Sequence, residues 1–243
     1  MRLLAIGDIH GCLRAFTTLL DAVALQPDDR IITLGDYVDR GPNSRGVLDR
    51  LIELHSTGRL VVLRGNHDIM MLDARHSTDP MWVACGGGAT LLSYGATDQQ
   101  IEDAIEKGGH YGDLLLKVPP GHWRFLEEEC LPWYETETHF FVHANADADL
   151  PLDQQSDDML YWQKLLRPCV HVSGKTMICG HTRQKSGLPL NLGTTICIDT
   201  NVYEDGWLTC LDVHTGRIWQ ANELGKARCG WMDDCPRGDE ESE

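Results

Sequence analysis

The stretch LVVLRGNHD, residues 60–68, changes character in its middle. Its first four residues are apolar and are typical of a buried strand. The five residues that follow, RGNHD, are ones that a hydrophobic core cannot hold without partners for their polar groups. We therefore interpret residues 60–63 as a core strand that ends at a functional site.

Other short apolar runs along the chain end in the same way. Each has the length and the β-branched or leucine content of a strand, and each runs into polar or glycine-rich residues. These runs are residues 2–6, 30–34, 139–142, 175–179 and 195–198. Residues 13–23 and 47–54 separate the early runs and carry apolar residues at helical spacing. This alternation predicts an α/β fold with a largely parallel sheet.

The rest of the chain modifies this plan. Residues 206–220 predict two antiparallel strands joined at HTG, which gives the fold an α+β component. Residues 69–138 contain a glycine cluster, helical patches and a Pro-Pro pair that suits the entry to a helix over about 121–129. We interpret 69–138 as a helical insertion over the site and 229–243 as a solvated acidic tail. Residues 1–243 then form a single domain.

Composition narrows the class of protein. The formal net charge of −16 disfavours binding to nucleic acid or to anionic membranes. The chain shows no signal peptide and no apolar run of membrane-spanning length, since Gly7 and Asp8 interrupt the first hydrophobic stretch. Its nine cysteines are odd in number and lack a disulfide-like spacing, which indicates reduced thiols in the cytoplasm.

Ligands of open α/β sheets bind beyond the carboxyl ends of the strands, where the polar junctions of this chain lie. The side chains collected there are Asp8, His10, Asp36, Asp39, Arg40, Arg64, Asn66, His67, Asp68, His143 and His181. Each of them alone has a structural explanation, such as a helix cap or a hydrogen-bonded core histidine. Those explanations would have to hold independently at five strand ends, so we favour one shared site.

Carboxylates, imidazoles and an amide without thiolates suit Mn²⁺, Fe or Zn²⁺. The ligands are too many for one ion and predict two divalent metal ions, most simply Mn²⁺, with Asp36 as the candidate for a bridging carboxylate. Arg40 and Arg64 would then grip a phosphate through bidentate hydrogen bonds.

Five motifs, in their order along the chain, resemble the phosphoprotein phosphatase family of calcineurin-like metallophosphoesterases. They are GDIHG (7–11), GDYVDRG (35–41), LRGNHD (63–68), VHA (142–144) and CGHT (179–182). The resemblance covers residues 1 to about 200 and is greatest to the compact bacterial and phage serine/threonine phosphatases. The same motif set occurs in symmetric diadenosine tetraphosphate hydrolases.

The resemblance implies a β-sandwich of two mixed sheets flanked by helices. It also implies that Asp8, His10 and the bridging Asp36 hold one metal ion. The second ion would be held by Asp36, Asn66, His143 and His181.

The resemblance further implies that His67, oriented by Asp39, is the general acid, and that Arg40 and Arg64 bind the phosphoryl oxygens. These roles agree with the chemistry. A hydroxide held between two metal ions can attack phosphorus in line, and a serine alkoxide is a poor leaving group that benefits from a proton donor.

The chain departs from the family pattern at three places. Asn145 stands in HAN and Asn201 in IDTN, where a glycine is usual, and these changes bear on substrate preference. A further phosphate-contacting arginine usually follows a Leu-Trp pair. In DDMLYWQKLLRP (157–168) either Lys164 or Arg167 fills that place.

The sequence therefore predicts a metal-dependent phosphomonoesterase that acts on phosphoserine or phosphothreonine in proteins. The alternative is hydrolysis of a dinucleotide polyphosphate. That substrate favours a basic, aromatic pocket, and the insertion shows no clear basic cluster.

Overall fold

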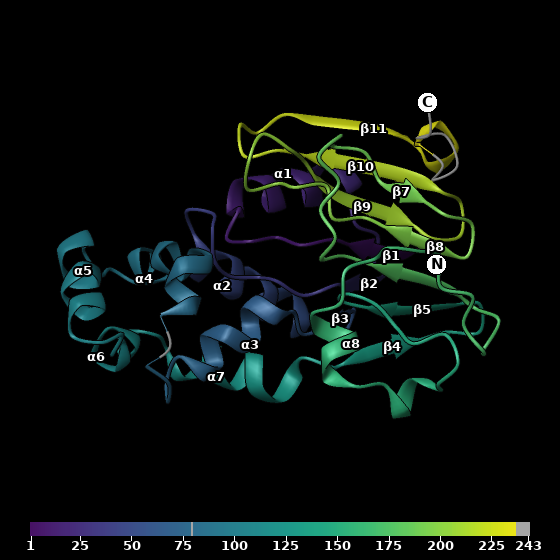
Figure 1. Cartoon of the computed structure of the whole chain (residues 1–243). Coiled ribbons are helices and arrows are strands. Elements are labelled where there is room, and N and C mark those ends of the chain that lie inside the picture. The colour runs from purple at the N-terminus through teal and green to yellow at the C-terminus, as the bar shows by residue number, and fades with distance from the viewer. Residues whose placement is uncertain (79, 237–243) are drawn as a thin grey trace.

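The computed structural model describes residues 1–78 and 80–236 and builds them around two mixed β-sheets (Figure 1). The first sheet has the strand order β11-β10-β9-β1-β2-β3. Its parallel part comprises β1 (Leu3–Ile6), β2 (Arg30–Thr33) and β3 (Leu60–Val62). Its antiparallel part comprises β9 (Leu208–Asp212), β10 (Arg217–Ala221) and β11 (Ala227–Trp231).

The second sheet has the order β4-β5-β6-β8-β7. The three central strands β5 (His139–Val142), β6 (Thr176–Cys179) and β8 (Thr195–Cys197) are parallel. The edges, β4 (Trp133–Glu135) and β7 (Leu190–Asn191), run antiparallel to their neighbours. Every strand predicted from the sequence is present.

The two sheets pack face to face over a shared apolar core. Ala5, Ile32 and Val61 of the first sheet lie in one buried cluster with Phe141 and Ile178 of the second. Alternate residues of the same strands, such as Leu4 and Ile6, point to the opposite face, into the cluster beneath the helices. This is the predicted β-sandwich. Its core strands are buried on both faces, which explains their near-continuous apolar sequences.

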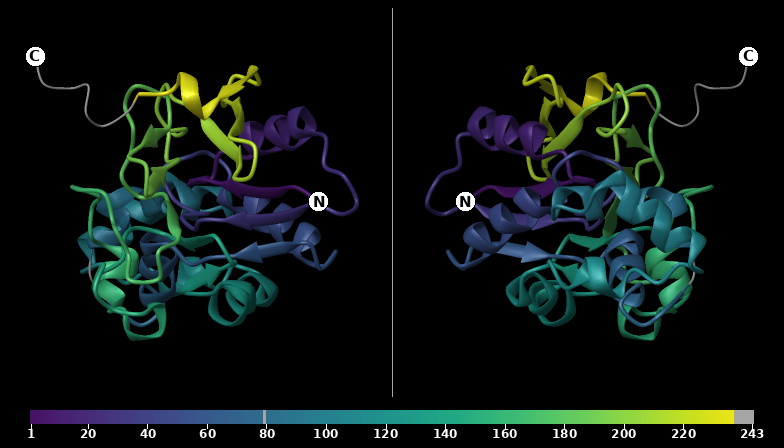
Figure 2. Two further views of the ribbon diagram at one scale, coloured as in Figure 1. Left: turned by 90° about the vertical axis from the view of Figure 1, so that its right-hand side faces the viewer. Right: turned by 90° about the vertical axis from the view of Figure 1, so that its left-hand side faces the viewer.

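Helices cover the outer face of the first sheet (Figures 1 and 2). They are α1 (Leu13–Val23), which lies against β9 and β10, and α2 (Ser44–His55), which lies against β3. Helix α2 begins where the Asn43 side chain accepts a hydrogen bond from the Gly46 amide. Three residues separate the end of β3 from helix α3 (Asn66–Asp73), and α8 (Asp157–Tyr161) follows β5.

The predicted insertion at 69–138 is helical only in part. It contains α4 (Gly88–Ser93), α5 (Asp98–Glu106), α6 (Gly112–Leu115) and α7 (Pro120–Arg124), with π-helical turns at Val83–Gly87 and Phe125–Glu129. Helices α4 to α6 project away from both sheets in Figure 1. Residues 133–135 correct the prediction, because they form β4 and belong to the second sheet.

The acidic tail predicted at 229–243 also needs correction. Residues up to Trp231 pair with β10, and the short helix Met232–Asp234 brings Met232 and Cys235 into the core between the sheets. Residues 237–243 lie outside the described part of the chain. Within the described part, the search for a helix of membrane-spanning length and hydropathy gave no candidate.

Candidate active site

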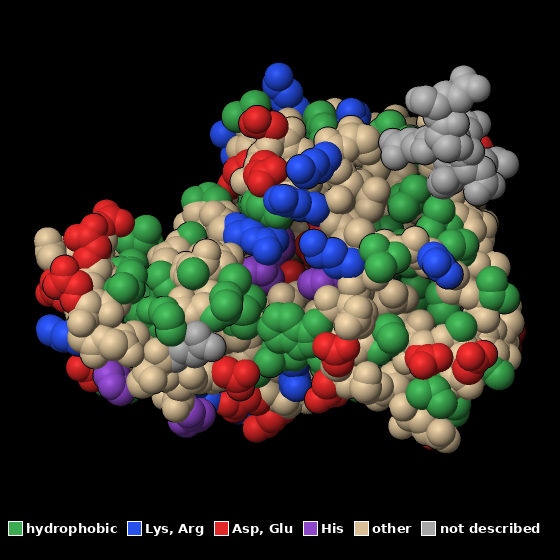
Figure 3. All heavy atoms as spheres, viewed as in Figure 1, with side chains coloured by type: hydrophobic (Ala, Val, Ile, Leu, Met, Phe, Trp, Pro, Cys, Tyr) green, Lys and Arg blue, Asp and Glu red, His purple; other side chains and the backbone are tan. Residues whose placement is uncertain are grey.

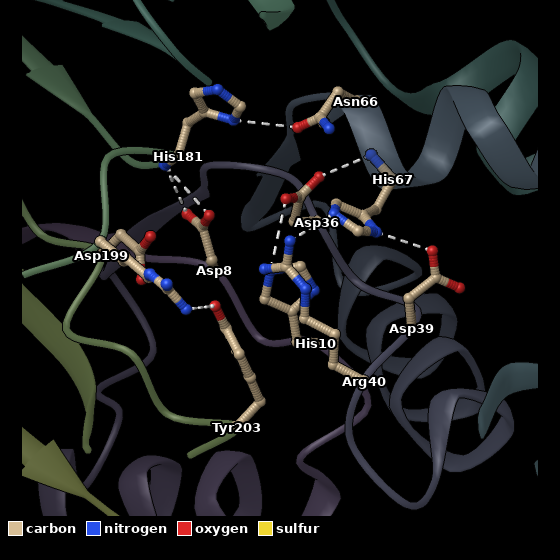
Figure 4. Close-up of polar contacts among 12 residues, drawn as sticks. Asp8, His10, Asp36, Asp39, Arg40, Asn66, His67, His181, Asp199 and Tyr203 are labelled. Atoms are coloured by element: carbon tan, nitrogen blue, oxygen red, sulfur yellow. Dashed lines mark hydrogen bonds and ion pairs between the residues drawn. The ribbon is translucent and has the colours of Figure 1, made fainter. Parts of the chain in front are cut away.

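The candidate site lies where the parallel strands of both sheets end (Figure 4). The loops after β1, β2 and β3 supply Asp8, Asp36 and Asn66. The ends of β5 and β6 supply His143 and His181 from the facing sheet. All of these side chains are buried except that of His181, which is partly exposed.

The backbone at the site is strained. Among the described residues, the non-glycine residues with positive φ are His10, Ala24, Asp36, Asp39, Arg40, His181 and Asn201. Five of these seven are predicted site residues, and such conformations persist only where the surroundings enforce them.

Asp68 supplies much of that enforcement. Its carboxylate accepts hydrogen bonds from the amides of Gly65, Asp36 and Tyr37 at 2.9–3.0 Å. It thereby ties the loop after β2 to the loop after β3, so the last residue of RGNHD serves as a support for the site.

Backbone carbonyls orient the histidines. Nδ1 of His10 lies 3.0 Å from the carbonyl oxygen of Val38, and Nδ1 of His143 lies 2.8 Å from that of Leu34. Each Nδ1–H donates to its carbonyl, which leaves the Nε2 lone pair of each ring directed into the site. A second hydrogen bond that fixes the tautomer is usual for histidines that bind metal.

These nitrogens converge on Asp36. Nε2 of His10 is 3.4 Å from one carboxylate oxygen, and Nε2 of His143 is 3.5 Å from the other. Oδ1 of Asn66 lies 2.9 Å from Nε2 of His143 and 3.0 Å from Nδ1 of His181. The donor atoms of His10, Asp36 and His67 form one group and those of Asp36, His143 and His181 form another, so Asp36 belongs to both, as expected for a bridging carboxylate.

The buried carboxyl groups of the site also favour the binding of cations. Burial raises the pKa of Asp8 well above its usual value, and the nearby carboxylates of Asp199 and Asp36 raise it further. Burial likewise raises the pKa of Asp199, to about 6. Divalent ions would compensate such a concentration of buried carboxylates, so the donor set fits two metal ions.

His67 and Asp39 form the predicted pair. Nδ1–H of His67 donates to Oδ2 of Asp39 over 2.7 Å, and both side chains are buried. Burial disfavours the charged imidazole, but the carboxylates of Asp36 and Asp39 outweigh burial and raise the pKa of His67 above its usual value. Asp39 thus orients the ring through Nδ1, and the two carboxylates favour its protonated form, which a general acid requires.

Two side chains of the insertion donate hydrogen bonds to Asp39 of this pair. Nε1–H of Trp82 and the Thr90 hydroxyl both donate to the Asp39 carboxylate, at 3.0 and 2.8 Å. The Gly86 carbonyl accepts from the Arg40 amide, and Gly86 itself has φ 118°. A side chain at Gly87 would collide with the Trp82 ring, so the glycine cluster of the insertion allows close approach to the site.

The two arginines predicted to bind phosphate lie in different surroundings. Arg40 reaches the centre, with its guanidinium 2.8 Å from Nε2 of both His10 and His67. The prediction for Arg64 is corrected by the structure. Its guanidinium donates to the backbone carbonyls of Leu126 and Glu127, at 2.9 and 2.8 Å. Arg64 also lines neither of the cavities that contain Arg40. It holds the π-helical turn against β3 instead.

Two cavities flank Arg40. The first, of about 780 Å³, is polar and contains Asp36, His181 and Lys164. The second, of about 670 Å³, lies on the His67 side, and its lining includes Met70, Met81, Trp82 and Trp162. Arg167 lies in a separate hollow of about 380 Å³, so the structure brings Lys164 and not Arg167 to the cavity of Asp36.

The family model described as calcineurin-like phosphoesterase matches residues 1–184, the part of the chain that supplies all of the predicted metal ligands. The chain belongs to the calcineurin-like phosphoesterase family.

Named relatives divide between two activities. The chain is 40% identical over 211 residues to serine/threonine-protein phosphatase 1 of Salmonella typhimurium, covering 84% of this chain and 88% of that protein. It is 44% identical over 79 residues to a symmetrical bis(5'-nucleosyl)-tetraphosphatase of Acidovorax sp., covering 32% of this chain and only 27% of that protein.

Solved structures share the calcineurin-like fold. A protein provisionally described as a diadenosine tetraphosphatase superposes with a TM-score of 0.63 at 18% identity, covering 95% of this chain and 93% of that chain. A cold-active protein tyrosine phosphatase superposes with a TM-score of 0.61 at 17% identity, covering 97% and 80%. At these identities the likeness supports the fold alone.

The candidate set from the sequence omitted several residues of this calcineurin-like site. Asp199 carried a signal, because it follows the strand run 195–198 just as Asp8 follows the first run. Tyr203, whose ring lies 4.9 Å from His10 and 4.5 Å from the Arg40 guanidinium carbon, carried none. Trp82 and Thr90 carried none either, since only tertiary packing places the insertion beside Asp39.

The two asparagines that depart from the family pattern behave differently. Asn145 has no positive φ, and its side chain donates to the Lys164 carbonyl. Asn201 has φ 61° and donates from Nδ2 to Glu204. Asn201 therefore adopts the left-handed conformation that a glycine would take there.

Proposed function

We propose that this protein is a dinuclear metal-dependent phosphomonoesterase that removes phosphate from phosphoserine and phosphothreonine in proteins. The observation that carries the proposal is the similarity to a serine/threonine-protein phosphatase over most of both chains. The tetraphosphatase of Acidovorax sp. matches 32% of this chain and 27% of its own length.

The metal ligands would divide into two sets that share Asp36, which belongs to both groups of converging donor atoms. Asp8, His10 and Asp36 would hold one divalent ion, and Asp36, Asn66, His143 and His181 would hold the other. Two bound ions lower the pKa of water and offset the negative charge of the phosphoryl group. We propose Mn²⁺, with Fe or Zn²⁺ as alternatives, because the donors are oxygen and nitrogen atoms without a thiolate.

The side chains supply the remaining steps. Arg40 points into the centre beside Asp36 and would bind the phosphoryl oxygens through its planar guanidinium. Asp39 fixes Nδ1 of His67, so Nε2 is the atom that would give its proton to the leaving serine oxygen. No side chain needs to form a covalent bond to phosphorus.

We also propose a reducing compartment such as the cytoplasm, and no binding to nucleic acid or membrane. All nine cysteines are free thiols, including Cys229 and Cys235, which lie close in sequence. The net charge of −16 would repel polyanionic surfaces.

A substrate panel tests the proposal. We expect phosphoserine and phosphothreonine peptides to have a higher kcat/KM than diadenosine tetraphosphate, with p-nitrophenyl phosphate as a general reporter. Each assay is repeated with Mn²⁺, Fe²⁺ and Zn²⁺ after removal of bound metal. Preferential cleavage of diadenosine tetraphosphate would replace the proposal with dinucleotide polyphosphate hydrolysis. Absence of metal-dependent p-nitrophenol release would refute both.

A further inference from the structure

The polar cavity beside Arg40 gathers positive charge on an acidic protein. It is lined by four cations, Arg40, Lys164, Arg183 and Lys185, and by three carboxylates, Asp36, Asp199 and Glu204, although the whole chain carries a net charge of −16. Figure 3 shows several Lys and Arg side chains around a hollow in which histidine is visible. The side of the site on which they gather is therefore suited to an anion.

Only part of this positive charge is neutralised by the protein. Arg183 donates to the hydroxyl of Tyr203 and to a carboxylate oxygen of Glu204, both at 3.0 Å. Lys164 and Lys185 are exposed and form no hydrogen bond or ion pair through their ammonium groups with any residue in 1–78 or 80–236. Two cations of the cavity thus remain available to a ligand.

The cationic groups are connected to the catalytic residues. The ring of Tyr203 lies against both His10 and Arg40, and its hydroxyl accepts from Arg183. Arg183 lies in the same loop as His181, whose own amide donates to Asp8. An anion held by Arg183 would therefore lie next to the phosphoryl group at Arg40.

Both asparagines that depart from the family pattern support this side of the cavity. Asn145 donates to the carbonyl of Lys164, and the next amide, of Leu165, donates to the hydroxyl of Thr182. Asn201 donates to Glu204, the ion-pair partner of Arg183. Asn145 thus holds the backbone of Lys164, and Asn201 holds Glu204, the counter-ion of Arg183.

The other flank of Arg40 is chemically different. Its cavity is lined in part by Met70, Met81, Trp82 and Trp162 and in part by polar residues that include His67 and His76. Among its described lining residues Arg40 is the only lysine or arginine, and Asp73 adds negative charge. A dinucleotide polyphosphate carries phosphates on both sides of the cleaved bond and would meet cations on one side only. A peptide with an acidic residue on one side of the phosphoserine and an apolar residue on the other matches both flanks.

We propose that Lys164, Arg183 and Lys185 form a second anion-binding subsite, and that the preferred substrates are phosphopeptides with an acidic side chain next to the phosphorylated residue. This proposal rests on the protein phosphatase function proposed above and specifies its substrate class.

The test compares two phosphoserine peptides that differ only in acidic residues or alanines beside the phosphoserine. For the unmodified protein we expect kcat/KM to be about tenfold higher for the acidic peptide, the scale of two partly exposed charge pairs. In the Lys164→Ala/Lys185→Ala variant this ratio should fall to near one. Because the ratio is taken within each variant, a general loss of active protein does not alter it.

The matched control is Lys107→Ala/Lys226→Ala, which removes two exposed lysines outside both cavities and changes the net charge equally. It should keep the full ratio. As a gain-of-function arm, Lys164→Glu/Lys185→Glu should reverse the preference toward a peptide with lysines beside the phosphoserine.

The outcomes separate the two proposals. Equal hydrolysis of the acidic and neutral peptides, or an unchanged ratio in the Lys164→Ala/Lys185→Ala variant, would overturn the subsite and leave the phosphatase function standing. Turnover of p-nitrophenyl phosphate or diadenosine tetraphosphate without turnover of either peptide would overturn both.

Discussion

Asp36 joins the two metal-binding groups of the site. One carboxylate oxygen faces His10 and the other faces His143, which comes from the opposite sheet. A glutamate would have the same charge but place that charge one methylene further along, where Gly65 already packs against the Asp36 carboxylate. The identity of this single side chain therefore matters in both its charge and its length.

His67→Asn tests the assigned proton donor. We expect metal occupancy to be retained and kcat on an alkyl phosphate to fall by roughly 10²–10⁴-fold, the usual scale of general acid catalysis. The loss should be smaller on an aryl phosphate, whose leaving group needs a proton less. Equal losses on both substrates would count against the acid role.

Asp29 provides a test of stability against pH. Its buried carboxylate accepts hydrogen bonds from Arg2 at 2.9 and 2.5 Å and from the Gln26 amide, and the bond from Arg2 is the main reason that the pKa of Asp29 lies below its usual value. A lowered pKa stabilises the fold above the unfolded value of about 3.9 and loses that effect as pH falls through the folded value.

Asp29→Asn should lower the free energy of unfolding at pH 7 by about 1.5–3 kcal/mol, and the difference from the unmodified protein should shrink below about pH 4. Urea unfolding of both proteins at a series of pH values measures this difference in the free energy of unfolding. The control is Asp28→Asn, since Asp28 is exposed and forms an ion pair with the terminal amine of Met1. A pH-independent deficit for Asp29→Asn would show that its charge is not the cause.

At the scale of elements, the insertion contributes to the chemistry through one short segment. The π-helical turn 83–87 and the start of α4 place Trp82 and Thr90 on the Asp39 carboxylate. Helices α5 and α6 pack further out, against their neighbours in the insertion (Figure 1). The insertion thus supports the His67–Asp39 pair and also forms part of the wall of the cavity on the His67 side of Arg40.

Thr90→Val and Trp82→Phe each remove one hydrogen-bond donor to Asp39. Either change should reduce kcat by about tenfold, the scale of one hydrogen bond to a charged group. Because both act through His67, the loss should again be larger for alkyl than for aryl phosphates. Trp123→Phe, outside both Arg40 cavities, is the control. A loss that is equal for both leaving groups would indicate a purely structural effect.

At the scale of the whole molecule, the site joins the two sheets. Asp8, Asp36 and Asn66 come from the first sheet, and His143 and His181 come from the second. Ions bound by both sets would bridge the sandwich at its carboxyl edge, so binding and folding should be thermodynamically linked.

Removal of metal should therefore lower Tm. At a concentration of Mn²⁺ about 100 times its Kd, the added stability is about 2.7 kcal/mol. Thermal unfolding with a chelator and then with added Mn²⁺ measures this, and Asp36→Asn should lose most of the response. An unchanged Tm across these conditions would argue that the ions do not bridge the sheets.

The sequence by itself determined the fold class, the core strands and the residues that gather at the site, because each core strand is a short apolar run that ends in chemically distinctive residues. It did not predict β4, β7 or β11. Asp8, Asp36, Asn66, His143 and His181 could be placed together because carboxyl ends of parallel strands meet at one edge. Tertiary structure decided what depends on packing between distant segments. It sent Arg64 to the carbonyls of Leu126 and Glu127, brought Lys164 rather than Arg167 to the cavity, and set Trp82 and Thr90 on Asp39. Long side chains in loops take their direction from neighbours that no local pattern specifies. For this reason the sequence could place the candidate metal ligands together but could not say which long side chains face the cavities.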